Sequence, residues 1–145
     1  MSTVDPAHHD RMRAISGPGI VLYVLTISFA SVDWVMSLDA HWFSTIFGVY
    51  YFAGSALAFF STLPILSVLL QRSGRLTGLI STEHYHDVGK LMFGFTVFWA
   101  YIAFSQYMLI WYANIPEGTG WFVHRQTGPW VWIALALLFG HLLIP

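Results

Sequence analysis

Residues 40–71 read AHWFSTIFGVYYFAGSALAFFSTLPILSVLLQ and contain no Asp, Glu, Lys or Arg. A helix that crosses a bilayer needs roughly 20 mostly apolar residues, because hydrocarbon about 30 Å thick offers its backbone no water. This stretch is long enough to span, so it predicts a transmembrane helix. Residues 91–116 and 126–145 are also free of these four residue types and repeat the signal later in the chain.

The composition of the whole chain supports a membrane protein. Of its 145 residues, 57% are hydrophobic, 18% are aromatic and 9% are charged. Soluble domains carry about 25% charged residues. The net charge of −1 gives no basic surface for nucleic acid. Cysteine is absent, which excludes disulfides and thiolate-bound metal or iron–sulfur centres within this chain.

The hydropathy pattern predicts an all-α fold, a polytopic transmembrane helix bundle with three full spans and a fourth partial span. The expected elements are a polar N-terminal arm, residues 1–16, and spans over residues 17–37, 43–70, 87–115 and 129–145. Pro18 suits the first turn of the first span, where its missing N–H is not needed. The last span is short, about 24 Å at 1.5 Å per residue. We therefore expect residues 17–145 to be a fragment of a longer bundle.

The basic residues are distributed unevenly between the two sides of the expected bundle. Five of the six lie on the side of the N-terminus and of the loop after the second span: Arg11, Arg13, Arg72, Arg75 and Lys90. Only Arg125 lies on the other side. By the positive-inside rule, the N-terminus faces the cytoplasm. Six of the seven tryptophans, Trp42 among them, fall on the outer side, which is typical of an aromatic belt that anchors a bundle in lipid.

One face of the third span carries an ionisable cluster followed by hydroxyl groups. At 100° per residue, this stripe contains Glu83, His86, Asp87, Lys90, Tyr101 and Ser105. Hydrocarbon cannot solvate charge, so such groups usually face the protein interior or a watery cavity. The stripe predicts a proton entry site that feeds a chain of hydroxyls and water. The alternative is an ordinary helix start, with Ser81 or Thr82 as the cap and Glu83 at the positive end of the helix dipole.

A second polar group lies at the outer end of the first span. Asp33 is flanked by apolar residues, and Asp39 and His41 follow in the short outer turn. An aspartate in that position is costly unless it is paired or hydrated. Because histidine titrates near neutrality, the three residues are candidates for binding a quinol hydroxyl and taking its proton. The alternative is that Asp39 and His41 are solvated turn residues and that Asp33 makes an interhelical hydrogen bond.

Metal binding and catalysis by this chain alone are not expected. His84 and His86 point about 200° apart on a helix, so they cannot chelate one ion together. Glu83 and His86 form one E-x-x-H motif, whereas a di-iron bundle needs two. The second span has a face of small and hydroxylated residues, which predicts a surface for helix packing. These residues are Ser44, Gly48, Tyr51, Ser55 and Thr62.

Several long strings in the chain resemble the ActF-type membrane subunit of bacterial alternative complex III. They are FASVDWVMSL at residues 29–38, HWFSTIFG at 41–48, EHYHD at 83–87, FWAYIAFSQY at 98–107 and IWYANIPE at 110–117. The resemblance extends from about residue 16 to residue 145, and strings of this length are far more specific than a short motif. Members of the family are far longer, which again implies that this chain is part of a larger bundle.

The resemblance implies a fold and a function. Alternative complex III is a quinol:electron-acceptor oxidoreductase of the bacterial inner membrane, and its large membrane subunits resemble the NrfD and polysulfide-reductase anchors. Haem c and iron–sulfur clusters reside on partner subunits, so no cofactor is expected in this chain, although quinol is possible. ActF-type subunits are proposed to contribute a proton route. This favours a proton path through Glu83, His86, Asp87, Lys90, Tyr101 and Ser105 over quinol binding by Asp33, Asp39 and His41.

Two alternatives to a respiratory subunit remain open. A small independent transporter or channel would form a homo-oligomer and conduct a solute, but the chain has no internal repeat of the kind many transporters show. A purely structural membrane anchor would use the polar stripe only to pack against neighbouring helices.

Overall fold

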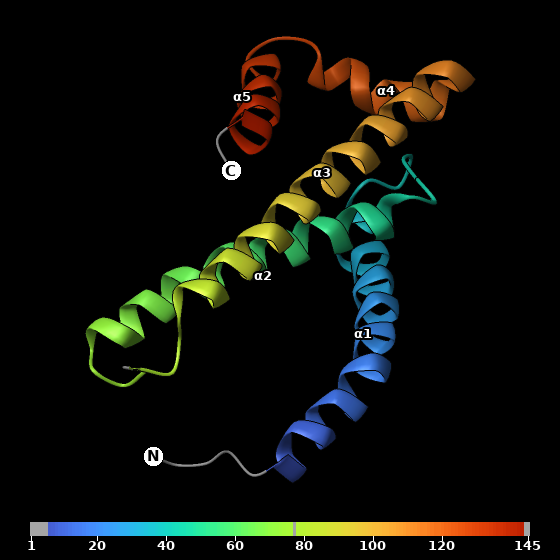
Figure 1. The fold of residues 1–145 in the computed structure, drawn as a ribbon. Coiled ribbons are helices and arrows are strands. Elements are labelled where there is room, and N and C mark those ends of the chain that lie inside the picture. The colour runs from blue at the N-terminus through green and yellow to red at the C-terminus, as the bar shows by residue number, and fades with distance from the viewer. Residues whose placement is uncertain (1–5, 77, 144–145) are drawn as a thin grey trace.

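The computed structural model describes residues 6–76 and 78–143, so residues 1–5 of the predicted arm and residues 144–145 of the predicted last span lie outside the described residues. All regular structure within the described part is helical (Figure 1). The elements are α1 (Pro6–Trp34), η1 (Met36–Leu38), α2 (Phe47–Arg72), α3 (Thr82–Ala113), α4 (Pro116–Arg125) and α5 (Trp130–Leu143). The prediction of an all-α helix bundle is confirmed.

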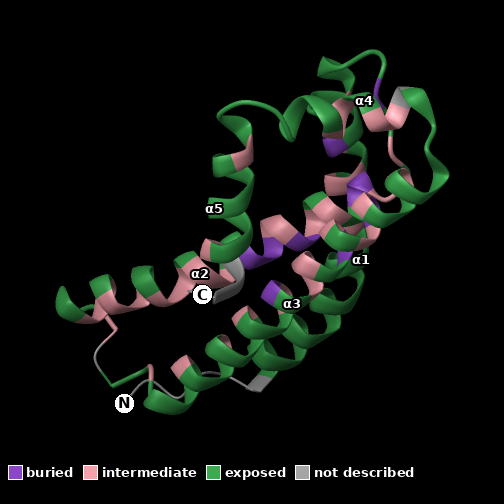
Figure 2. Ribbon diagram, turned by 90° about the horizontal axis from the view of Figure 1, so that it is seen from above, coloured by how far each residue is buried: buried purple, intermediate pink, exposed green. Residues whose placement is uncertain are grey.

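Three of the helices are long and apolar enough to cross a membrane. These candidate spans cover Ala7–Leu38, Phe47–Arg72 and Thr82–Ala113, and Trp130–Gly140 is a shorter apolar helix. Little of each span is buried by the rest of the chain, and Figure 2 shows most of the ribbon as exposed. The chain is therefore a multi-pass integral membrane protein whose helices offer much of their surface to lipid or to neighbouring proteins.

The first helix begins earlier than the first predicted span. α1 starts at Pro6 and includes most of the predicted polar arm. Pro18 lies inside this helix, so its placement in a first turn was wrong. The missing N–H of Pro18 frees the carbonyl of Ala14 four residues earlier. Ala14 is exposed, so that carbonyl is not enclosed by the rest of the chain.

The second and third helices form an antiparallel pair that makes the largest helix contact. α1 packs across α2, and α5 runs back beside the later part of α3 (Figure 1). Aromatic rings fill much of the contact between α2 and α3. Phe60 stacks on Phe95 with ring centroids 5.4 Å apart, and Phe52 meets the same ring edge-on at 6.2 Å. Ala53 and Leu57 of α2 are buried.

Small residues allow α1 and α2 to approach closely. A Cβ atom at Gly48 would lie only 2.9 Å from the Cβ of Ser28. Ser31 is fully buried nearby on α1 and donates a hydrogen bond of 2.7 Å to the carbonyl of Ser28. Further along, the hydroxyls of Tyr23 and Ser55 are 2.8 Å apart. The predicted packing face of the second span is thus confirmed at Gly48 and Ser55.

The Tyr23–Ser55 hydrogen bond gives a first testable prediction. Because the Ser55 hydroxyl donates to the carbonyl of Phe52, Tyr23 is the donor to Ser55. Hydrogen bonds between membrane helices contribute about 0.6 kcal/mol on average and at most about 1.7 kcal/mol. We expect Tyr23→Phe to lower the free energy of unfolding by that amount in a detergent denaturation series. Tyr112→Phe is the control, because Tyr112 is 85% exposed, and an equal loss in both variants would contradict the prediction.

Candidate functional site

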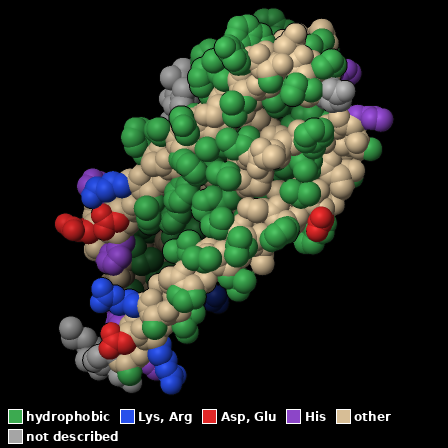
Figure 3. Space-filling view, turned by 90° about the vertical axis from the view of Figure 1, so that its right-hand side faces the viewer, with side chains coloured by type: hydrophobic (Ala, Val, Ile, Leu, Met, Phe, Trp, Pro, Cys, Tyr) green, Lys and Arg blue, Asp and Glu red, His purple; other side chains and the backbone are tan. Residues whose placement is uncertain are grey.

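Most of the charged residues gather at one end of the molecule. The start of α1, the end of α2 and the start of α3 lie at this end, and Figure 3 shows Lys, Arg, Asp, Glu and His side chains collected there beside a largely hydrophobic surface. α2 ends because Gly74 adopts a φ of 80°, and the N–H of Arg75 then bonds the carbonyl of Leu70. This is the usual glycine stop of a helix. We call this the charged end of the chain. The opposite end contains the packed rings of Trp42, Phe47 and Trp121, and we call it the aromatic end.

The start of α3 is fixed by a cap. The backbone N–H of Ser81 donates to Nδ1 of His84 over 3.2 Å, and the Ser81 hydroxyl lies 2.7 Å from the same nitrogen. Glu83 lies in the first turn, where the helix dipole favours a negative charge. The interpretation of this segment as a capped helix start, with Ser81 as the cap, is confirmed. His84 serves this cap, and His86 is the histidine of the predicted stripe.

The predicted proton-path residues share one face of α3, and this face points away from α2. Glu83, His86, Asp87, Lys90 and Tyr101 are exposed and Ser105 is half-buried, whereas Thr96, Ile102 and Gln106 on the other face are buried. Lys90 Nζ lies 3.1 Å from Asp87 Oδ1. An exposed pair of this kind adds little stability. The described chain thus aligns these groups but does not enclose them.

The three predicted outer-side residues are exposed as well. The carboxylate of Asp39 accepts a hydrogen bond of 3.2 Å from the backbone N–H of His41, which closes a local turn. Within the described residues, no hydrogen bond links Asp33 to Asp39 or His41. Asp39 and His41 are therefore linked by a hydrogen bond between a side chain and the backbone, and Asp33 lies separately on the surface of α1.

An aromatic stack ties α4 to the connection between α1 and α2. Trp42 is only 5% exposed and stacks on Trp121 with centroids 4.7 Å apart and planes 16° from parallel. Phe47 meets Trp42 edge-on at 5.3 Å, and the guanidinium of Arg125 lies 3.3 Å from the centroid of Trp121. For Trp42, the prediction of lipid anchoring was therefore wrong, because this ring packs inside the protein.

Two polar groups in this stack have unusual surroundings. The indole Nε1 of Trp42 is buried, and it has no hydrogen-bond partner among the described residues. Burial lowers the pKa of Arg125, and the negative charge of Asp39 opposes that shift. An arginine remains charged under such a shift. The charge of Asp39 therefore acts on Arg125, although the two residues lie far apart in the sequence.

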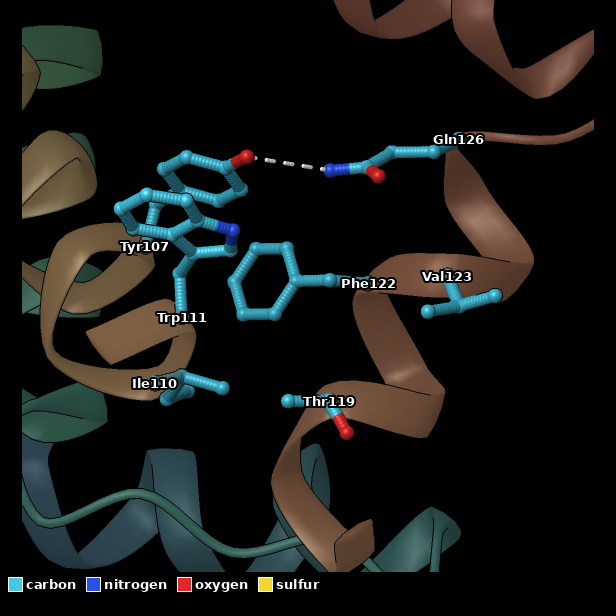
Figure 4. A pocket seen from close by; sticks show the side chains of 7 residues that line it. All are labelled: Tyr107, Ile110, Trp111, Thr119, Phe122, Val123 and Gln126. Carbon is cyan, nitrogen blue, oxygen red and sulfur yellow. Dashed lines mark hydrogen bonds between the residues drawn. The ribbon is translucent and has the colours of Figure 1, made fainter. Parts of the chain in front are cut away.

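A small cleft lies beside the stack, where α4 docks on α3 (Figure 4). Tyr107 and Trp111 project from α3 towards Phe122 of α4, and Nε2 of Gln126 donates to the Tyr107 hydroxyl over 3.3 Å. The cleft holds about 50 Å³. Pockets for small-molecule ligands usually hold about 300–1,000 Å³. The cleft is therefore part of the packing between the two helices.

The signals for α4 were present in the sequence. Asn114 ends α3 in the left-handed conformation, with a φ of 49°. Pro116 occupies the first turn of α4, and His124 and Arg125 occupy its last turn. Proline at a helix start and cations at a helix end are both favourable. The sequence predicted no helix between the spans over residues 87–115 and 129–145, so α4 was missed.

Comparison with known proteins adds no further assignment. No family model matches the chain, and no curated protein matches it. Among the residues that the structure describes, no three His, Asp or Glu side chains are grouped as metal ligands. The fold and the site define a multi-pass membrane helix bundle with a charged end, an aromatic end and an uncovered polar face on α3.

Proposed function

We propose that the chain is a membrane subunit of a quinol-oxidising respiratory complex of the alternative complex III type, in the inner membrane of a bacterium and with its N-terminus in the cytoplasm. The long strings of sequence that resemble the ActF-type subunit support this assignment. In this proposal, haem c and iron–sulfur clusters belong to partner subunits. The partners also supply the catalytic steps of quinol oxidation, so this chain is not an enzyme alone.

The observation that carries the proposal is the uncovered polar face of α3. Ionisable residues within or at the edge of a membrane usually face a protein interior, a partner or water, because lipid cannot solvate them. Glu83, His86, Asp87 and Lys90 have no cover from the described part of this chain. A further helix, from a partner subunit or from the rest of a longer bundle, would provide that cover. A subunit of a larger complex satisfies this requirement.

A proton route is the function that this face supports best. Lys90 and Tyr101 are eleven residues apart, which corresponds to about 16 Å along a helix. No proton crosses such a distance in one step, so water must fill the gap between the charged cluster and the hydroxyls of Tyr101 and Ser105. That water would lie between α3 and the helix that covers it. The route therefore needs the assembled complex.

The clefts described among residues 6–76 and 78–143 are lined by residues other than the three predicted to bind quinol. Asp33, Asp39 and His41 are exposed, and the negative charge of Asp39 acts on Arg125. A quinol headgroup needs an enclosed site with placed polar groups. We therefore assign quinol binding to the partner subunits.

The proton route predicts a separation of proton coupling from electron transfer. In the complex, Asp87→Asn and Lys90→Met should each slow coupled proton movement about tenfold or more, because a positioned acid or base accelerates transfer by about 10²–10⁴. Quinol-driven reduction of the electron acceptor should persist. The measurement is acidification or alkalinisation of vesicles that contain the complex. Arg72→Met is the control at the same end of the molecule, and full coupling in both α3 variants would contradict the route.

A purely structural anchor is the second candidate. The Ser81–His84 cap and the exposed Asp87–Lys90 pair account for part of the polar cluster as an ordinary helix start. If the stripe only packs against neighbours, Tyr101→Phe and Ser105→Ala will reduce assembly of the complex and leave proton movement per assembled complex unchanged.

A further inference from the structure

A large apolar groove lies where α1, α2 and α3 meet. It holds about 570 Å³. Pockets for small-molecule ligands usually hold about 300–1,000 Å³, so the groove is large enough for a ligand. Its lining comes from all three helices and includes Ile20 of α1, Phe52 and Phe59 of α2, and Leu91 of α3. None of its residues belongs to the proposed proton path, so the groove needs an explanation of its own.

The groove offers an occupant no free hydrogen-bond donor. The hydroxyl of Tyr23 is the polar group among the lining residues, and it already donates to the hydroxyl of Ser55 over 2.8 Å. Every other lining residue that the structure describes is apolar. A polar group placed there would lose its bonds to water without replacement, which is costly. The occupant must therefore be a hydrocarbon group.

The depth of the groove agrees with a hydrocarbon occupant. Its three walls are the three candidate spans. On α3 the groove is lined from Leu91 onwards, nine residues after the helix begins at Thr82, which is about 14 Å along the helix. The hydrocarbon core of a bilayer is about 30 Å thick. Counted from the charged end, this part of the groove therefore lies among the acyl chains of one leaflet.

The lining suits a flexible chain better than another helix. Helices in membranes approach each other through small residues, as α1 and α2 do at Ser28 and Gly48. The groove has four phenylalanine rings in its lining and one small residue, Ala56. Large rings keep a rigid helix backbone at a distance, whereas an acyl chain can bend between them. An acyl chain therefore fits this lining, and a closely packed helix does not.

The charged end supplies positive charge for the headgroup of a lipid. Lys90 at this end is paired with Asp87. The guanidinium of Arg13 is exposed and forms no ion pair with any described residue. Arg13 precedes Ile20 by seven residues, nearly two full turns, so the two lie on about the same face of α1. In total, five basic residues of the described chain lie at this end against three acidic residues: Arg11, Arg13, Arg72, Arg75 and Lys90 against Asp10, Glu83 and Asp87.

We infer that the groove binds an acyl chain of an anionic phospholipid whose headgroup lies at Arg13. Anionic headgroups attract basic residues at a membrane surface. Arg13 lies about 10 Å nearer the charged end than Ile20, so one lipid can place its chain in the groove and its headgroup beside the guanidinium. The inference does not depend on the assignment to a respiratory complex, because it uses only the groove and the charges of this chain.

The test is photo-crosslinking of the full chain with Phe59→benzoylphenylalanine, which keeps an aromatic ring in the groove. The matched control is Phe104→benzoylphenylalanine, because Phe104 is 62% exposed on α3 and lies outside the groove. Each variant is placed in vesicles of equal parts phosphatidylglycerol and phosphatidylethanolamine and irradiated, and the adducts are identified by intact mass. Adducts at the Phe59 position should contain about fivefold more phosphatidylglycerol, the usual effect of one basic residue near a membrane surface. Adducts at the Phe104 position should contain the two lipids about equally.

Two further measurements separate a bound lipid from the surrounding bilayer. Arg13→Gln should remove the enrichment of phosphatidylglycerol at the Phe59 position. Arg11→Gln should leave it unchanged, because residues two apart point about 200° apart on a helix. When the vesicles are diluted into neutral detergent, the phospholipid adduct at the Phe59 position should persist after the adduct at the Phe104 position has been lost.

The identity of the adduct decides between the possible occupants. A phospholipid adduct with this preference and this persistence supports the inference. A cross-link to a second copy of the chain, or to another protein when native membranes are irradiated, would show that a helix fills the groove and would overturn the inference. Equal lipid composition and equal loss on dilution at the two positions would also overturn it, and so would an unchanged enrichment in Arg13→Gln. Phe59 and Phe104 are both exposed, so both variants keep the fold.

Discussion

Replacing Trp42 with alanine should lower the free energy of unfolding by about 3–5 kcal/mol, the usual range for a buried Phe or Trp cut back to alanine. Trp42 is almost fully buried between Phe47 and Trp121. Its loss would leave a cavity between α4 and the start of α2. Denaturation in mixed detergent micelles, followed by near-ultraviolet circular dichroism, measures the effect.

Trp132→Ala is the matched control, because Trp132 is 74% exposed. It should change the stability by less than about 0.5 kcal/mol in micelles, as surface substitutions usually do. The pair Trp42 and Trp121 should also couple in a double-mutant cycle by about 0.5–1.5 kcal/mol, the range for stacked aromatic pairs. Equal stability of Trp42→Ala and Trp132→Ala would show that the stack does not hold α4 in place.

Replacing Gly48 with leucine should separate α1 from α2 and destabilise the chain by about 1–3 kcal/mol, the usual range for overpacking. The reason is the contact with Ser28: even a single Cβ atom at Gly48 would lie 2.9 Å from the Ser28 Cβ and 3.3 Å from its Cα. Backbone is involved, so a change of side-chain rotamer cannot relieve the clash. Small residues at helix contacts allow such close approach in membranes.

Gly94→Leu separates this clash from the general effect of removing a helical glycine. Nothing lies within 4 Å of a Cβ at Gly94, on the open face of α3. Both substitutions remove the entropic disadvantage of glycine in a helix, about 0.5–1 kcal/mol. We therefore expect Gly94→Leu to be neutral or stabilising in the same denaturation series. A loss of stability in Gly94→Leu as large as that in Gly48→Leu would contradict the α1–α2 contact.

Much of the fold could be predicted because length and hydropathy are local properties. The charge-free run at residues 40–71 contains the whole helical part of α2 up to Gln71, and residues 91–116 contain most of α3. The helix period also placed the polar residues of α3 on one face. The period could not show that this face would be uncovered, because that depends on which side of α3 receives α2.

The aromatic end could not be predicted because its contacts are distant in sequence. Trp42, Trp121 and Arg125 come from segments that meet only after the bundle has folded. The presence of tryptophans at a membrane boundary is compatible with lipid anchoring and with packing inside the protein, so composition alone does not distinguish the two roles. Gln106 was similarly hidden: the sequence shows one amide within an apolar run, and only the fold shows that it lines a cleft.

The central claim, a membrane subunit of a quinol-oxidising complex, is tested most directly by identifying what the chain binds in its native membrane. The measurement is a purification from membranes in mild detergent, with mass spectrometry of every co-eluting protein. If the chain is such a subunit, it should co-elute with multihaem cytochrome c and iron–sulfur subunits, whose loss should destabilise this chain. A homo-oligomer of the chain that elutes without such partners would contradict the assignment to a respiratory complex and favour an independent transporter.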